Sequence, residues 1–138
     1  MKNIFALLLL LVCATSYAQS THKWYSTDSS TYHISATKKI NGCDKVIAEK
    51  SYSKTGALLS EWKKEYVIDK HQTCDFSAYI KTEKKYSGKI LLQQSQYVSG
   101  CDDCEEVPCG TWQIFNTSGK LVETKQLGAC NVAQFKKS

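Results

Sequence analysis

The densest group of reactive side chains lies between residues 101 and 109, in the segment Cys-Asp-Asp-Cys-Glu-Glu-Val-Pro-Cys. Cysteines with this spacing occur in zinc sites and in thiol–disulfide enzymes. A structural zinc site needs four ligands, and here the fourth would have to come from Cys130 or a distant histidine. Four neighbouring carboxylates would raise the pKa of the thiols, which opposes redox catalysis. The cluster therefore favours ordinary disulfides in an acidic, solvated connection, and we predict no metal, no cofactor and no catalytic residue.

The number of cysteines points the same way. The chain of 138 residues has seven, and the first, Cys13, lies in an apolar N-terminal run. An even number in the rest of an exported chain is typical of a disulfide framework. Six cysteines allow 15 pairings, and we expect the group between 101 and 109 to include partners for distant cysteines. The predicted disulfide residues are Cys43, Cys74, Cys101, Cys104, Cys109 and Cys130.

The N-terminus predicts export. Lys2 precedes an unbroken apolar run from Ile4 to Val12, and Ser16-Tyr17-Ala18 places small residues where a signal peptidase cleaves. We predict a signal peptide over residues 1–18, cleaved near Ala18, and a secreted or periplasmic protein. The run is shorter than the ~20 residues that span a bilayer, so no transmembrane segment is expected in the mature chain. Val12 before Cys13 does not fit the lipoprotein signal, which argues against a lipid anchor.

The sequence after the predicted signal peptide predicts strands and turns. Residues 58–68 alternate with period two, and Phe76–Thr82, Lys89–Leu92 and Trp112–Phe115 have similar β-prone composition. Tight turns are predicted between these segments, and no window sustains a helical period. Residues 19–37 are expected to hold at least one strand, with a loose leader as the alternative. The fold class is therefore an all-β, disulfide-stabilised antiparallel meander of stacked hairpins, in one domain over residues 19–138.

Three turn glycines recur at nearly equal intervals. Gly56, Gly88 and Gly119 each follow an aromatic residue and precede apolar positions. Self-similarity at a fixed period is typical of stacked repeat units. The best-formed unit runs from Gly110 to Leu121 and contains Trp112, Phe115 and Gly119.

This unit resembles the variant MORN (membrane occupation and recognition nexus) repeat, with its Gly-x-Trp, a following aromatic and a Gly-Lys-Leu turn. Such repeats occur in bacterial YwqK-like antitoxin-type proteins. The resemblance covers one good unit and two degenerate ones, around Gly56 and Gly88. It implies a β-repeat protein that binds a partner.

Composition and motifs exclude several functions. All 18 basic residues are lysines, and without arginine the chain lacks the planar forks that read phosphate and guanine, so we expect no nucleic-acid partner. No nucleophile elbow, phosphate loop or dinucleotide fingerprint is present, so no enzymatic activity is predicted. Trp62 and Trp112 are expected in the core because they lie in alternating strands, whereas Trp24 has polar flanks that favour exposed recognition. The histidines are expected on the surface.

Two hypotheses of function follow. The first is an exported, non-enzymatic β-repeat protein that binds a protein or a cell-envelope component. The second is a small secreted metal-binding or enzymatic module that uses the Cys101–Cys109 cluster, or a secreted hydrolase inhibitor.

Overall fold

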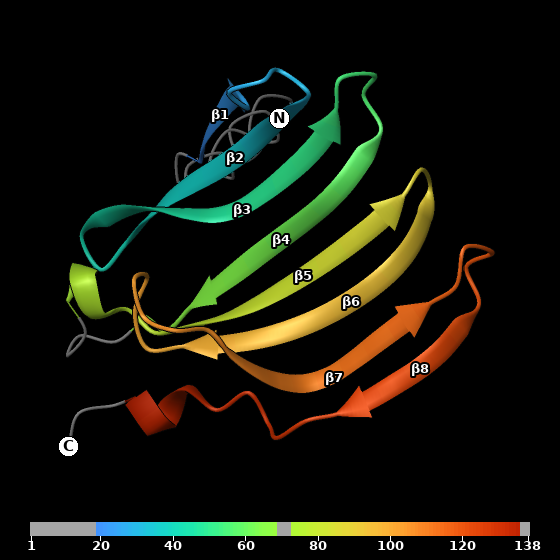
Figure 1. Cartoon of the computed structure of the whole chain (residues 1–138). Helices are drawn as coiled ribbons and strands as arrows, with labels where there is room; N and C mark the ends of the chain where they lie inside the picture. Colours follow the sequence, from blue (N-terminus) through green and yellow to red (C-terminus); the bar gives the residue numbers. More distant parts are fainter. Residues whose placement is uncertain (1–18, 69–72, 136–138) are drawn as a thin grey trace, which may run out of the picture.

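A computed structural model describes residues 19–68 and 73–135, and this part of the chain forms one curved antiparallel sheet (Figure 1). Each strand pairs with its neighbours in sequence, so the sheet is a meander, as predicted. The predicted signal peptide, Cys13 and His71 lie outside the described residues. The strands are β1 (Ser20–Tyr25), β2 (Thr31–Ile40), β3 (Cys43–Ser53), β4 (Leu58–Tyr66), β5 (Tyr79–Ser87), β6 (Ile90–Ser99), β7 (Val107–Phe115) and β8 (Leu121–Gln126).

The period-two segments form strands near their predicted positions. The segment from Leu58 becomes β4, and the predicted strand at Phe76 begins later, at Tyr79, because the 3₁₀ helix η1 (Cys74–Phe76) precedes it. Residues 19–37 contain β1 and most of β2, so this region is not a loose leader. Strand β3 was not predicted. A second 3₁₀ helix, η2 (Val132–Phe135), follows β8.

Three hairpins share the same local geometry. Gly56, Gly88 and Gly119 occupy the turns β3–β4, β5–β6 and β7–β8 with φ of 88°, 59° and 81°, a region that glycine enters without a steric penalty. In each hairpin the register shifts next to the turn, and just beyond the shift an aromatic residue pairs with a leucine. These pairs are Tyr52 with Leu58, Tyr86 with Leu91, and Phe115 with Leu121.

The two ends of the sheet differ. The three hairpin turns lie at one end, whereas η1, η2 and the loop between β6 and β7 gather at the other (Figure 1). We call the second the closed end, formed by residues 40–43, 74–79, 98–109 and 128–135. It contains every buried hydrophobic side chain among the described residues: Ile40, Ala78, Tyr79, Val98, Cys101 and Cys109. The core is therefore small and lies at one end.

All three disulfides lie at the closed end. Cys43 pairs with Cys74, Cys101 with Cys104, and Cys109 with Cys130, with Cα–Cα distances of 5.5, 5.0 and 5.0 Å, in the normal range for disulfides. The predicted framework is thus present, and the 101–109 group supplies a partner for one distant cysteine, Cys130. Three disulfides indicate an oxidising, extracellular compartment. No helix in the described ranges has the length and apolar character to cross a bilayer.

Candidate functional site

All three tryptophans of the chain lie on one face of the sheet. Directly paired residues on neighbouring strands share a face. The register links Trp24 through His33 and Ser51 to Ser60, which is two residues from Trp62 in β4 and so on the same side. We call this side the tryptophan face.

The third tryptophan joins this face through the central strands. Lys64, two residues from Trp62, pairs with Lys81 of β5, and Lys81 pairs with Tyr97 of β6. The ring of Tyr97 contacts that of Trp112 at a centroid distance of 5.2 Å. The indole nitrogen of Trp112 also donates a hydrogen bond to the Gln96 carbonyl, at 3.0 Å.

The centre of the tryptophan face is aromatic and polar. The middle parts of β4, β5 and β6 place no aliphatic side chain on it. Trp62 and Trp112 were expected in the core, and this prediction was wrong: both are only half-buried, because no helix or second sheet among the described residues packs over them. The central residues of the face are Ser60, Trp62, Lys64, Tyr66, Tyr79, Lys81, Glu83, Lys85, Gln93, Ser95, Tyr97 and Ser99.

Two lysines lie across the aromatic rings. The Lys64 ammonium is 4.1 Å from the centre of the Tyr79 ring and 5.5 Å from that of Trp62. The Lys81 ammonium is 5.4 Å from the centre of the Tyr97 ring. Such cation–π contacts, together with the packing of the alkyl stems, hold both side chains close to the sheet.

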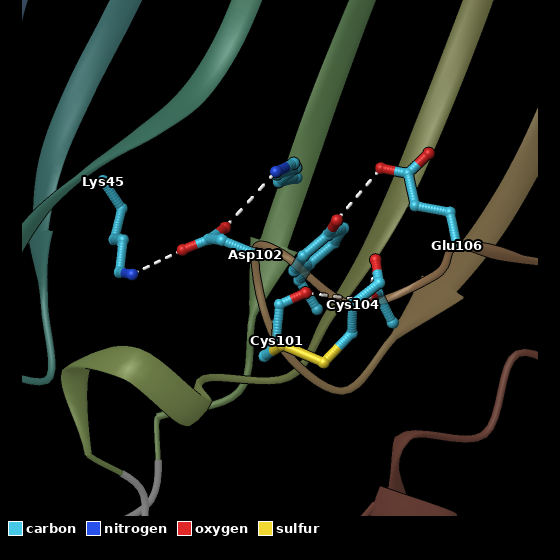
Figure 2. Close-up of a disulfide and its surroundings, with 8 residues drawn as sticks. Lys45, Cys101, Asp102, Cys104 and Glu106 are labelled. Carbon is cyan, nitrogen blue, oxygen red and sulfur yellow. Dashed lines mark hydrogen bonds and ion pairs between the residues drawn. A yellow bond between two sulfur atoms is a disulfide. The ribbon is translucent and has the colours of Figure 1, made fainter.

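The loop between β6 and β7 folds back onto this face. Its Asp102 carboxylate contacts the ammonium of Lys45 from β3, and Figure 2 shows this pair beside the Cys101–Cys104 disulfide. The same carboxylate lies 3.3 Å from the Lys64 nitrogen and accepts a hydrogen bond from the Tyr66 hydroxyl at 2.5 Å. Asp102 thus connects the loop to β3 and β4.

A second carboxylate of the loop contacts the next strand. Glu106 accepts hydrogen bonds from the Tyr79 hydroxyl at 3.0 Å and from the Lys81 ammonium at 2.9 Å. The expectation of a solvated acidic connection was therefore wrong for Asp102 and Glu106. It holds for Asp103 and Glu105, which are exposed.

These contacts move several pKa values away from neutrality. Burial and the neighbouring carboxylates raise the pKa of Tyr66 and of Tyr79 well above the usual range. Burial opposes the ionised form of Asp102, but hydrogen bonds from Lys45 and Tyr66 and the charge of Lys64 outweigh it and lower the pKa of Asp102. Near neutral pH the carboxylate stays ionised and both phenols stay protonated. The arrangement is suited to holding the loop in place and poorly suited to proton transfer.

The cysteine cluster has no thiolate in this structure. Cys101 and Cys104 are bonded to each other, and Cys109 is bonded to Cys130. Disulfide sulfur atoms are not the thiolates that zinc or a nucleophilic mechanism requires. Across the described ranges, no group of three or more histidine, cysteine, aspartate or glutamate side chains is placed to hold a metal ion.

Trp24 and His33 form a pair at the edge of the tryptophan face. Their rings stack with a centroid distance of 3.9 Å and an interplanar angle of 10°. His33 also lies 2.8 Å from the Ser51 hydroxyl and 3.4 Å from the Glu49 carboxylate, measured from Nδ1. The expectation of a surface histidine was wrong for His33, whose side chain is 17% exposed. Trp24 is 41% exposed, as its polar flanks suggested.

The residues of the best-formed repeat unit lie in β7 and the turn that follows. Gly110 has φ of 68°, and a Cβ atom there would lie 2.2 Å from the Gln96 side-chain oxygen and 3.2 Å from the Cys130 sulfur. The Gln96 side chain can move aside, but the positive φ strains any other residue there, and the Cys130 sulfur narrows the space beside the Cys109–Cys130 disulfide. Trp112 lies on the tryptophan face, whereas Phe115 and Gly119 shape the β7–β8 turn.

Sequence reasoning missed the cluster around Asp102. Lys45, Lys64 and Tyr66 are far from Asp102 in sequence, and β3, which carries Lys45, was not predicted. The available signal was the alternation Trp62, Lys64, Tyr66, which puts a lysine among aromatic side chains on one side of β4.

Comparison with known proteins found no matching family model, curated protein or solved structure. The resemblance to variant MORN repeats therefore stays a proposal.

Proposed function

We propose that the protein is an exported, non-enzymatic β-repeat module that binds a cell-envelope component, and foremost a polysaccharide, on the tryptophan face. The observation that carries this proposal is that Trp24, Trp62 and Trp112 share one face, and that no helix or second sheet of the described chain packs over these three rings. Half-exposed tryptophan and tyrosine rings are typical of recognition surfaces because they combine large apolar area with a polar edge.

The polar residues of the face favour a hydroxylated, uncharged ligand. Its central residues on β4, β5 and β6 include no aliphatic side chain, and Ile114 lies at their border, where it pairs with Gln93; the core of a protein–protein interface is mostly apolar. The carboxylates of Asp102, Glu106 and Glu83 are paired with lysines, so the charges largely balance within the protein. Sugars offer an apolar ring face for the indoles, and hydroxyls for the partly exposed side chains of Ser60 and Gln93.

Export and the repeat assignment are part of the proposal. The three disulfides support an oxidising destination, and residues 1–18 have the composition of a signal peptide. The shared aromatic–leucine pair and register shift of the three hairpins support the resemblance to variant MORN repeats.

The second hypothesis gains no support from the geometry. A metal-binding or enzymatic role for the Cys101–Cys109 cluster requires free thiolates, whereas these cysteines are in disulfides. Inhibition of a secreted hydrolase would require a protein partner on the same face, and it is an outcome of the experiment that follows.

The test is a titration of the oxidised mature chain with cell-wall polysaccharide and soluble oligosaccharides, followed by tryptophan fluorescence and co-sedimentation. Trp62→Ala is expected to weaken binding on the order of tenfold or more. Lys63→Ala is the matched control, because the neighbouring Lys63 side chain points to the opposite face and is 67% exposed. Binding that is equally strong in both variants would contradict the use of this face. Capture of a hydrolase by the wild-type chain, without polysaccharide binding, would favour the inhibitor instead.

A further inference from the structure

Strand β8 forms one edge of the sheet and is exposed along its whole length. Within residues 19–68 and 73–135, no strand pairs with its outer side. The strand and the residue after it carry apolar side chains in solvent: Leu121, Val122 and Leu127 are 43%, 58% and 39% exposed. An open edge with apolar residues readily adds another strand.

The backbone groups that face outward follow from the ladder with β7. The Leu127 N–H donates inward to the Gly110 carbonyl at 2.9 Å. Successive residues of an antiparallel strand alternate between bonding one neighbour and bonding the other. The pairing is regular from Ile114–Glu123 to Thr111–Gln126, so the backbone N–H and C=O groups of Glu123 and Lys125 point toward β7. Val122, Thr124 and Gln126 present their N–H and C=O groups to the free edge.

These outward groups restrict how β8 can pair with β8 of a second copy. In a two-fold antiparallel pairing, residues whose backbone groups face the free edge must lie opposite residues of the same kind. The two-fold axis therefore lies between one residue and the same residue of the second copy. An axis at Glu123 places two glutamates opposite each other, and an axis at Lys125 places two lysines opposite each other. Like charges directly opposite are destabilising.

An axis at Thr124 avoids both like-charge pairs. Glu123 then lies opposite Lys125 of the second copy, and Lys125 opposite Glu123. Leu121 lies opposite Leu127, and Thr124 lies opposite itself, which is a favourable cross-strand pair. Among the three registers centred on residues 123, 124 and 125, which pair most of the strand, this one alone joins opposite charges. The sequence from Leu121 to Leu127 is thus self-complementary in that register.

We propose that β8 is a dimerisation edge and that two copies of the chain join through antiparallel β8–β8 pairing centred on Thr124. The other edge of the sheet lacks this property, because β1 contains His22 and Lys23 and no acidic residue. Cross-strand partners share a face, so the tryptophan faces of the two copies lie on the same side of one continuous sheet. The dimer does not depend on the identity of the ligand.

The test is the oligomeric state of the oxidised mature chain by analytical ultracentrifugation over a range of concentrations. Because the edge is short, we expect a dissociation constant on the order of 10–100 μM. Glu123→Lys and Lys125→Glu each place like charges opposite each other and are expected to weaken the dimer on the order of tenfold. Both positions are half-exposed, so both variants are expected to fold.

An equimolar mixture of the two variants provides the decisive comparison. One variant then carries lysine at both positions 123 and 125, and the other carries glutamate at both. In a mixed pair every lysine of the first faces a glutamate of the second, so dimers are expected to form again. A wild-type chain that stays monomeric at millimolar concentration would overturn the proposal. Dimers of both single variants as strong as the wild type, or no recovery in the mixture, would also overturn it.

Discussion

Replacing Asp102 with asparagine removes a negative charge from among three donors while nearly preserving side-chain size. The side chains of Lys45 and Lys64 are 13% and 15% exposed, and that of Asp102 is 27% exposed. Exposed ion pairs contribute about 0.2–1 kcal/mol, whereas breaking a buried pair costs about 3–5 kcal/mol. For this partly buried group we expect a loss of about 2–3 kcal/mol, or roughly 5–15 °C in Tm.

The assay is urea unfolding at pH 7 with the disulfides intact. Asp103→Asn is the matched control, because the adjacent side chain is exposed and is expected to change stability by less than about 0.5 kcal/mol. The pH dependence gives a second readout. Since its partners lower the pKa of Asp102 below its ordinary value of 3.8, its stabilisation is present above pH 3.8 and is lost as the pH falls further. The difference between wild type and Asp102→Asn is therefore expected to shrink in acid.

Equal stability of Asp102→Asn and Asp103→Asn would refute this reasoning. It would mean that the contacts of Asp102 do not hold the β6–β7 loop against the sheet. A pH-independent difference between wild type and Asp102→Asn would assign the effect to packing, since only an ionised carboxylate attracts the two lysines.

Three further predictions concern other parts of the sheet. Burial and a 2.6 Å hydrogen bond to Glu61 raise the pKa of Tyr86 to about 12. The protonated phenol therefore stabilises the fold below pH 10, and this contribution is lost as the pH rises toward 12. The free energy of unfolding should fall less steeply with pH in Tyr86→Phe than in the wild type. The buried Ser95 hydroxyl has no hydrogen-bond partner in the part of the chain that the structure describes, so Ser95→Ala should raise the free energy of unfolding by about 1 kcal/mol. A clear loss of stability in urea unfolding would contradict this. Replacing Cys101 and Cys104 together with serine should cost about 2 kcal/mol in thermal unfolding, less than removal of either longer-range disulfide; an unchanged Tm would argue against a structural bridge.

The fold was largely predictable because most of its strands and turns have local signals in the sequence. Period-two alternation located β4, and the recurring glycines located the hairpin turns at Gly56, Gly88 and Gly119, where the structure shows a positive φ. Strand β3 was missed because its side chains are mixed in polarity and are mostly half-buried on both faces. Because no second sheet among the described residues packs on either face, the strands have no clean division between apolar and polar sides.

The candidate site was less predictable, for the same reason. The alternation in β4 correctly placed Trp62 on the same side of the strand as Lys64 and Tyr66. The prediction that this side is buried in a core assumed a second layer of structure packed against it. The pairing of Asp102 with Lys45 depends on how the loop folds back, and nothing near Asp102 in sequence specifies that path. The charged residues of the loop can be read from the sequence, whereas their partners can be identified only once the register of the sheet is known.

The order of the disulfides has a consequence for how the chain matures. Among the described residues the six cysteines pair in the order of the sequence: Cys43 with Cys74, Cys101 with Cys104, and Cys109 with Cys130. Of the 15 possible pairings, this is the one that forms when a chain enters an oxidising compartment N-terminus first and every thiol reacts with the next to arrive. In a chain exported in this way, the native bridges would form without rearrangement of earlier ones and without an isomerase.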